Sequence, residues 1–324
     1  MSLQEDNRDH LKATLRRFIR PGQGEFQLLE STVAKLPIGI SRAGQAFLHN
    51  LHGAISMVSM PYMLAITSAR QHRFHQLRMA SVLEVRAEML ESGCDLDAEL
   101  SPQQENLARE RAGERFSAEV QSTDGRDNLL YSACGLLDGA LQAKEFCSAA
   151  DELMQQGVVL AWGSMEALAR DLLICLVNSK RDLFLQLRDN PVTRRAFNLN
   201  HIDFETLEAY EFNLSDKLGD LIVHRSDFNS LHLIKDTYTC LFPGEGFVRE
   251  QLSDARLWML AQKRHVLVHN RGVADKRYLS ATGDSTKEGE VVRVGRDELL
   301  GYFSITSDAG RVLLEAASVV THQS

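Results

Sequence analysis

Prolines and closely spaced cysteines are scarce in this chain of 324 residues. It has six prolines, and between them apolar residues recur at three- and four-residue spacing, which is typical of helices rather than strands. The cysteines form no Cys-x-x-Cys pair, so neither a disulfide framework nor a zinc knuckle is predicted. They are Cys94, Cys134, Cys147, Cys175 and Cys240. We therefore expect an all-α protein that works in a reducing compartment.

The chain also lacks an excess of positive charge and a basic, apolar leader. Its formal charge of −8 at pH 7 argues against a protein that coats nucleic acids, because such a protein needs a surplus of Lys and Arg over one face. Any anion site must therefore be local. The first ten residues, MSLQEDNRDH, are acidic and polar where a signal peptide would have a basic end and an apolar run. A cytoplasmic protein is expected.

An apolar run long enough to cross a membrane is missing as well. The longest uncharged stretch covers residues 43–69, but His49, Asn50, His52 and Pro61 interrupt it. The uninterrupted part falls short of the ~20 residues that a spanning helix requires. We expect this stretch to form a buried helix and the protein to have no membrane partner.

Helical spacing covers most of the chain. The sequence Ser101-Pro102-Gln103-Gln104 predicts a helix start, because Ser suits the N-cap, Pro the first helical position and Gln the position three residues after the cap. Apolar spacing predicts further helices at 5–19, 43–69, 147–178, 204–223, 226–242, 247–270 and 297–320. We expect two parts, an N-terminal helical region of unknown role at 1–145 and a helical bundle at 146–324.

Positive charge is concentrated in one segment, residues 262–277, with the sequence QKRHVLVHNRGVADKR. It contains one carboxylate, Asp275, and two histidines, His265 and His269. The helix predicted at 247–270 ends inside it, because Gly272 suits the left-handed position after a helix. The five cations of the segment are Lys263, Arg264, Arg271, Lys276 and Arg277.

Two interpretations of this segment leave part of it unexplained. Cations at a helix end complement the helix dipole by about 0.3–1 kcal/mol each, which accounts for Arg271 and Lys276. It does not account for Arg264 and His269, which flank the apolar run 266–268 and should be partly buried. A desolvated guanidinium needs a lasting partner or a ligand. A zinc site would use His265 and a second histidine one turn later. Arg264 would repel the dication, however, and no third ligand has suitable spacing, so we expect no metal.

The third interpretation is phosphate chemistry. An arginine presents a planar fork of donors to a phosphoryl group, and a histidine exchanges a proton near neutral pH. On an ideal helix Arg264 and His269 differ by about 140° and ~7.5 Å, a gap that a long arginine side chain can span. Cleaving RNA through its 2′-hydroxyl requires both a base and an acid. A symmetric dimer would supply a second histidine by bringing two copies of this helix end together.

The same residues carry a resemblance to a known family. Arg264, four further residues and then His269-Asn270 resemble the Arg-x4–6-His signature of the HEPN superfamily. With VLAWGSMEALARDLL at 159–173 and NRGVADKRYL at 270–279, the chain is similar to the RiboL-PSP-HEPN type over residues 147–320. The resemblance implies a HEPN-type helical bundle within 146–324, with the region 1–145 as an addition. It further implies a homodimer in which the two 264–270 helices face each other.

The resemblance also implies roles for individual residues. Arg264 would bind the scissile phosphate, and His269 would act as the general acid or base. Asn270 would position the substrate or the histidine, and His265 would have a supporting role at most. The remaining cations would bind RNA phosphates; they are Lys263, Arg271, Lys276 and Arg277.

A supporting carboxylate is expected on the long helix at 147–178. By resemblance, Glu166 would contact the arginine of the signature. The alternative is an ordinary ion pair with Arg170, which follows one helical turn later.

The implied activity is that of a metal-independent endoribonuclease that leaves a 2′,3′-cyclic phosphate and needs no cofactor. Many superfamily members are toxins or antiphage effectors of prokaryotes that a partner restrains, so an antitoxin or regulatory partner is expected beside the RNA substrate. Other members have lost catalysis and act as binding or assembly modules. A non-catalytic interaction module is therefore the alternative function.

Overall fold

The computed structural model describes residues 13–22, 26–92, 99–224, 226 and 228–322. Within these residues the chain is all-α, as predicted, and β-type pairing is limited there to an isolated bridge between Val273 and Val291. None of the helices in the described ranges combines the length and the apolar character needed to span a bilayer.

Contacts divide the chain into two compact units. Unit 1 contains residues 1–20 and 59–150, and unit 2 contains residues 21–58 and 151–324. The sequence pattern predicts a division near residue 145, but the segment 21–58 belongs to the same unit as the C-terminal part of the chain. The larger segment of unit 1, residues 59–150, is therefore inserted into the sequence of unit 2.

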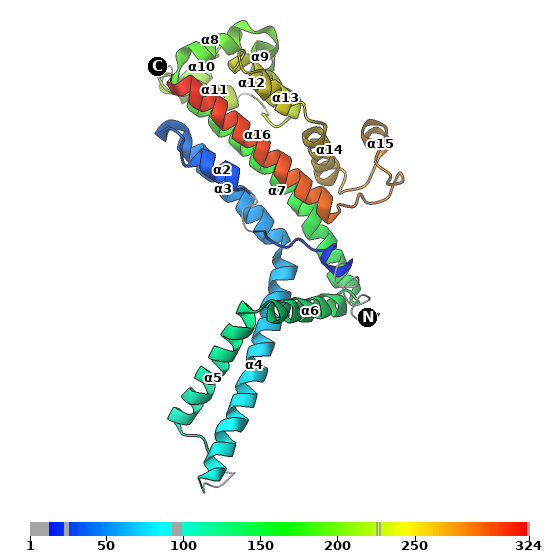
Figure 1. Cartoon of the computed structure of the whole chain (residues 1–324). Helices are drawn as coiled ribbons and strands as arrows, with labels where there is room; N and C mark the ends of the chain where they lie inside the picture. Colours follow the sequence, from blue (N-terminus) through cyan, green and yellow to red (C-terminus); the bar gives the residue numbers. More distant parts are fainter. Residues whose placement is uncertain (1–12, 23–25, 93–98, 225, 227, 323–324) are drawn as a thin grey trace. The chain divides into compact units, whose positions relative to one another are not determined.

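Unit 1 is built around one long helix, α4 (Met60–Glu91), which packs against α5 (Pro102–Gln121) and α6 (Thr123–Ala140). Figure 1 shows α5 lying alongside α4. Helix α5 begins with the predicted capping box, in which Ser101 accepts a hydrogen bond from the Gln104 backbone and the Gln104 side chain accepts one from the Ser101 backbone. A small apolar core holds the unit together; it contains Phe18, Tyr62, Ala65, Ala69, Ala133 and Leu137.

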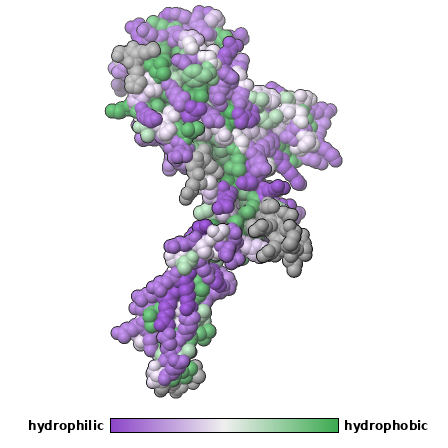
Figure 2. All heavy atoms as spheres, viewed as in Figure 1, coloured by the Kyte–Doolittle hydropathy of each residue, from purple (hydrophilic) through white to green (hydrophobic). Residues whose placement is uncertain are grey.

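Charged side chains join α4 to α5 on the surface of unit 1. Figure 2 shows hydrophilic side chains over much of the visible face of these two helices. Such exposed ion pairs contribute only about 0–1 kcal/mol each. They therefore affect which side chains of α4 and α5 face each other more than they stabilise the unit. The pairs are Arg73 with Glu119, Arg111 with Glu88 and Arg115 with Glu84.

Unit 2 is centred on α7 (Lys144–Ser179), which belongs to it from residue 151 onward. The helix α16 (Arg296–His322) lies along α7, with α3 (Ile38–Val58) beside them (Figure 1). The three helices meet at Gly310, where an added Cβ would lie 2.1 Å from the Phe47 ring of α3 and 3.0 Å from Leu168 of α7. These three helices form the apolar centre that supports the rest of unit 2.

Shorter helices surround this centre. Helix α14, which carries the HEPN-like signature, packs against α16 and α15. Helix α16 also contacts α2 and α13. The bounds are α2 (Gln27–Val33), α8 (Arg181–Asp189), α9 (Pro191–Ala196), α10 (Phe204–Ala209), α11 (Leu218–His224), α12 (Leu231–Leu241), α13 (Gly246–Gln251), α14 (Ala255–His269) and α15 (Lys276–Thr282).

The helices predicted at 147–178 and 297–320 correspond closely to α7 and α16, but three predicted helices are interrupted. The stretch 43–69 breaks at Ser59, where α3 ends and α4 begins with Pro61 in its first turn; proline has no N–H to continue the preceding helix. The stretch 247–270 breaks because the Asp254 carboxylate caps a new helix, accepting a hydrogen bond from the Arg256 backbone at 2.7 Å. Capping side chains of this kind compete with a continuous helix.

The predicted helix at 204–223 is replaced by two short ones, α10 and α11. Between them Glu211, Phe212 and Asp216 have positive φ angles of 52°, 55° and 56°, a left-handed conformation that ends a right-handed helix. The helix predicted at 226–242 begins later, at Leu231. The one predicted at 5–19 lies mainly outside the described residues, and residues 13–15 are helical.

Candidate functional site

The signature helix α14 is fixed by its buried face and by its two ends. Leu257, Leu260 and Val266 are buried, and each apolar side chain of this size contributes about 1.5–3 kcal/mol when fully buried. At the C-terminal end, the N–H of Gly272 (φ 76°) donates to the Val266 carbonyl at 3.0 Å. Val268, by contrast, is 45% exposed and does not anchor the helix. The helix end is thus held in place while one of its sides stays open.

That open side borders a cleft of about 610 Å³ in unit 2. The cleft is formed by α14, by the segment before and within α15, by the start of α12 and by α7. Its lining combines both tryptophans of the chain with cationic and titratable groups. They include Trp162, Trp258, Arg264, Arg277, His232, His265, His269, Asn270 and Asp275. Aromatic faces beside guanidinium and imidazole groups suit a ligand that carries both rings and negative charge.

Arg264 is held at the cleft by Glu166 of α7. Its Nη2 atom lies 3.6 Å from Glu166 Oε1, and its side chain is 22% exposed. The Trp162 indole N–H donates to the same Glu166 oxygen at 2.5 Å. Of the two partners considered for Glu166, the ion pair is therefore with Arg264, while the charge of Arg170 acts more weakly on it.

Burial dominates the electrostatics of this carboxyl. Desolvation raises the pKa of Glu166 above its usual value of 4.5, against the opposing effects of the Trp162 hydrogen bond and of the Arg264 and Arg170 charges. A carboxyl in this position is costly to ionise. Its charged form fixes the Arg264 guanidinium, leaving the other donors of the fork available to a ligand.

The two histidines of the signature lie in contact on α14. Their ring centroids are 4.7 Å apart at an interplanar angle of 46°. Burial, followed by the neighbouring His269, Arg277 and Arg264, lowers the pKa of His265, while Asp275 acts in the opposite direction. His265 therefore favours its neutral form. Both rings are exposed, so the partial burial expected for His269 is wrong.

Asn270 connects the end of α14 to the start of α15. Its side-chain amide donates to Asp275 Oδ2 at 2.9 Å, and Asp275 Oδ1 accepts from the Tyr278 backbone N–H at 2.7 Å as the cap of α15. These bonds lower the pKa of Asp275, the Tyr278 backbone having the larger effect. The amide is thus engaged in the wall of the cleft.

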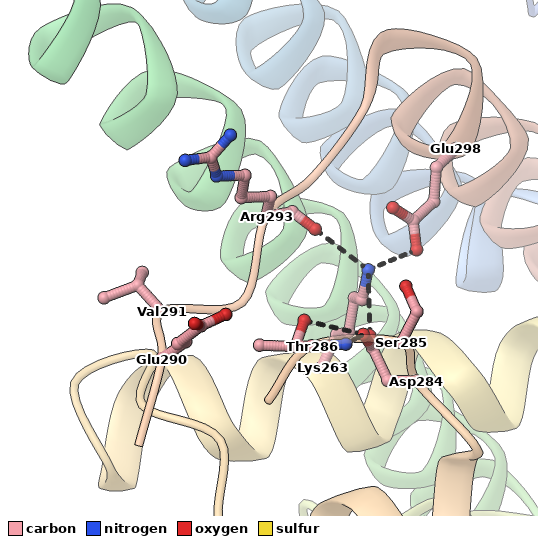
Figure 3. A pocket seen from close by; sticks show the side chains of 8 residues that line it. All are labelled: Lys263, Asp284, Ser285, Thr286, Glu290, Val291, Arg293 and Glu298. Carbon is pink, nitrogen blue, oxygen red and sulfur yellow. Dashed lines mark hydrogen bonds and ion pairs between the residues drawn. The ribbon is translucent and has the colours of Figure 1, made fainter. Parts of the chain in front are cut away.

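Lys263 is placed differently from the other cations, and its predicted role as a phosphate ligand is wrong. It is 4% exposed, and its Nζ atom donates to Glu298 Oε1 at 2.5 Å and to the Arg293 carbonyl at 3.2 Å, with Asp284 Oδ2 at 3.7 Å. Figure 3 shows these partners converging on the ammonium group from the segment 284–298. The ammonium is therefore committed to partners inside the protein, with two hydrogen bonds and two carboxylates around it.

The other cations divide between the cleft and the surface. Arg277 lines the cleft beside Arg264. Arg271 and Lys276 are exposed and lie outside the lining of that cleft. Arg271 has a φ of 54°, so its backbone takes part in ending the helix.

Trp162, Trp258 and His232 are among the cleft residues that were not predicted. Trp258 precedes His265 by seven residues and His269 by eleven, a spacing that puts all three on one helical face, so the sequence did contain a signal for it. His232 comes from another helix, and no local pattern joins it to the signature. Among the described residues, no group of three or more His, Cys, Asp or Glu side chains is arranged to hold a metal ion.

These contacts define the candidate site by its own residues. Two arginines, three histidines and two tryptophans share one cleft, with a carboxylate behind one of the arginines. The likeness of the 264–270 segment to the HEPN signature stays a prediction. Comparison of the chain with protein-family models, with curated proteins and with solved structures gives no match.

Proposed function

We propose that this chain is a metal-independent endoribonuclease that cuts RNA by attack of a 2′-hydroxyl on the adjacent phosphate. The observation that carries the proposal is the meeting of Arg264, held by Glu166, with His269 in one cleft. Attack forms a bond from the 2′-oxygen to phosphorus and breaks the bond from phosphorus to the 5′-oxygen. The products are a 2′,3′-cyclic phosphate and a 5′-hydroxyl.

Five residues of the cleft have a task in this reaction. Arg264 binds the non-bridging phosphate oxygens and stabilises the negative charge that builds up on them. Arg277, in the same lining, binds a neighbouring phosphate. His269 transfers a proton, which general acid–base catalysis makes worth about 10²–10⁴-fold in rate. Asn270 and Asp275 hold the end of α14 against the start of α15.

We further propose the biological setting that this activity suits. The enzyme works in the cytoplasm as a toxin or antiphage effector, as a homodimer, under the restraint of an antitoxin or regulatory partner. Exposed apolar groups on α14, Trp258 at 37% and Val268 at 45%, favour a protein contact on this side of unit 2, because such groups are concentrated in interfaces.

The test is RNA cleavage in excess EDTA by the wild type and by His269→Ala. We expect the wild type to cut tRNA or total RNA without metal, and the variant to lose at least about 100-fold in rate. His49→Ala serves as the matched control, because His49 is an exposed histidine on α3 of the same unit. Mapping of the new RNA ends should show cyclic phosphates.

Two results would overturn the proposal. One is cleavage that EDTA abolishes, which would require a metal. The other is an unchanged rate in His269→Ala. Binding of RNA without any cleavage would instead favour the non-catalytic interaction module, in which the Arg264 ion pair is purely structural.

A further inference from the structure

The proposed reaction needs two proton transfers on opposite sides of the phosphorus. In an in-line displacement the attacking and leaving oxygens are apical, so the group that takes the 2′-proton and the group that protonates the 5′-oxygen must face the phosphate from two directions. His265 and His269 are in ring contact at 4.7 Å on a single helix. A phosphoryl group does not fit between them, so together they serve one side.

A third histidine lines the same cleft from a different helix. His232 lines the cleft from the first turn of α12, two residues after the Ser230 cap. The Ser230 hydroxyl accepts from the Leu233 backbone N–H at 3.2 Å. Its side chain is 82% exposed, and its Nε2 atom lies 3.2 Å from Asp236 Oδ2, one turn further along α12. The carboxylate orients the ring, so that Nδ1 remains available to a substrate.

Helix α12 is a firm support for this histidine. Ile234, Thr237, Tyr238 and Leu241 are buried, and the Tyr238 hydroxyl donates to the Ala169 carbonyl of α7 at 2.5 Å. Helix α7 also carries Glu166, the partner of Arg264. Both walls of the cleft therefore contact the same central helix. His232 is thus held in a fixed relation to the arginine.

We propose that His232 is the second proton-transfer group, acting in the same chain as His269. This inference rests on the ribonuclease function proposed above. One of the two histidines accepts the 2′-hydroxyl proton as that oxygen attacks phosphorus. The other donates a proton to the 5′-oxygen as its bond to phosphorus breaks, and solvent exchange restores both rings. Asp236 is a positioning residue that acts through His232.

The test compares single-turnover cleavage of RNA by His232→Gln, Asp236→Asn and the control His49→Gln. We expect His232→Gln to lower the rate at least about 100-fold without weakening RNA binding, Asp236→Asn to lower it less, and His49→Gln to match the wild type. The wild-type rate should have a bell-shaped pH profile, and His232→Gln should lose one limb of it. The other titratable or charged groups facing this site are Arg264, His265, His269, Asp275, Arg277 and Tyr278.

A substrate with sulfur in place of the 5′-oxygen identifies the role, since a thiolate leaves without protonation. If His232 is the donor, His232→Gln recovers on this substrate; if it is the acceptor, the defect persists on both substrates. A wild-type rate for His232→Gln, beside an inactive His269→Ala, would overturn the assignment while the ribonuclease function stands. Wild-type rates for both variants would overturn the proposed function itself.

Mixing the two inactive variants tests whether the two histidines of a site come from one chain or from two. If His232 and His269 act within one chain, a mixture of His232→Gln and His269→Ala stays inactive, because every site lacks one group. Recovery of activity on mixing would show that the two histidines come from different protomers and would overturn the single-chain assignment.

Discussion

Glu166 is the residue at which stability and the proposed activity oppose each other. It accepts the indole N–H of Trp162 and pairs with Arg264, yet burial raises its pKa. A raised pKa means that the folded protein holds the proton more tightly than the unfolded chain does. The stabilising contribution of this carboxyl is therefore present below about pH 4.5 and is lost as the pH rises through its raised pKa.

Glu166→Gln tests this balance. The amide keeps an acceptor for Trp162 but cannot ionise. We therefore expect the free energy of unfolding of the variant to increase relative to that of the wild type as the pH rises from 4 to 7. Urea unfolding at several pH values measures the difference. Glu152→Gln, which changes an exposed carboxyl on the same helix, should show no such trend. An equal trend in both variants would contradict the assignment to Glu166.

At the residue scale, the sequence predicts an interaction when the two interacting groups lie close together along the chain. The capping of α5 by Ser101 depends on residues three apart, so the sequence predicts it. Lys263 is indistinguishable from its neighbours in the sequence, because the carboxylates that bury it lie at 284 and 298. His232 escapes prediction for the same reason.

At the scale of elements, the packing of α16 depends on the absence of a side chain at Gly310. The site has no room for a Cβ against Phe47. Gly310→Ala should therefore destabilise the protein by about 1–3 kcal/mol through overpacking. The shift of the midpoint in urea unfolding, at unchanged slope, measures this effect.

Gly301→Ala is the matched control on the same helix. A Cβ at Gly301 meets no atom within 4 Å, so the replacement should be neutral or should stabilise by up to ~1 kcal/mol, because alanine favours the helix. Equal effects of the two substitutions would mean that α16 does not approach α3 as closely as described.

Whether a segment is helical was easier to predict than where its helix begins and ends. The apolar period identifies α7 and α16 over most of their length. It continues unbroken through Asp254, however, so the period alone hides the start of α14 that the aspartate caps. At such an interruption the chain can either continue the helix or start a new one at a side-chain cap. The free energies of these two alternatives differ by only about 1 kcal/mol.

At the scale of the whole molecule, unit 1 interrupts the sequence of unit 2 without separating its parts in space. The chain leaves unit 2 after Val58, and Val58 Cγ1 would lie 2.8 Å from a Cβ at Gly157, one to two turns after unit 2 resumes. A short connection can therefore bridge the gap. We expect a chain with residues 60–150 replaced by about eight Gly and Ser residues to fold, since such a linker reaches ~15 Å.

Cooperative thermal unfolding followed by circular dichroism checks this expectation. Residues 151–324 alone are the matched comparison and should not unfold cooperatively, because they lack α3 and the Phe47 side chain that packs at Gly310. Failure of the linked chain to fold would show that unit 2 depends on unit 1.

The position of α16 also determines the order in which the protein can mature on the ribosome. Helices α2 and α3 are synthesised well before α16, but both pack against it. Unit 1 has all its residues once position 150 is made, and it can fold during synthesis. The apolar faces of α2 and α3 must wait until α16 has been synthesised, so the nascent chain carries them uncovered and can then bind a chaperone. If the cleft has the activity proposed for it, that delay keeps the site unfinished until α16, which packs against α14, has been made.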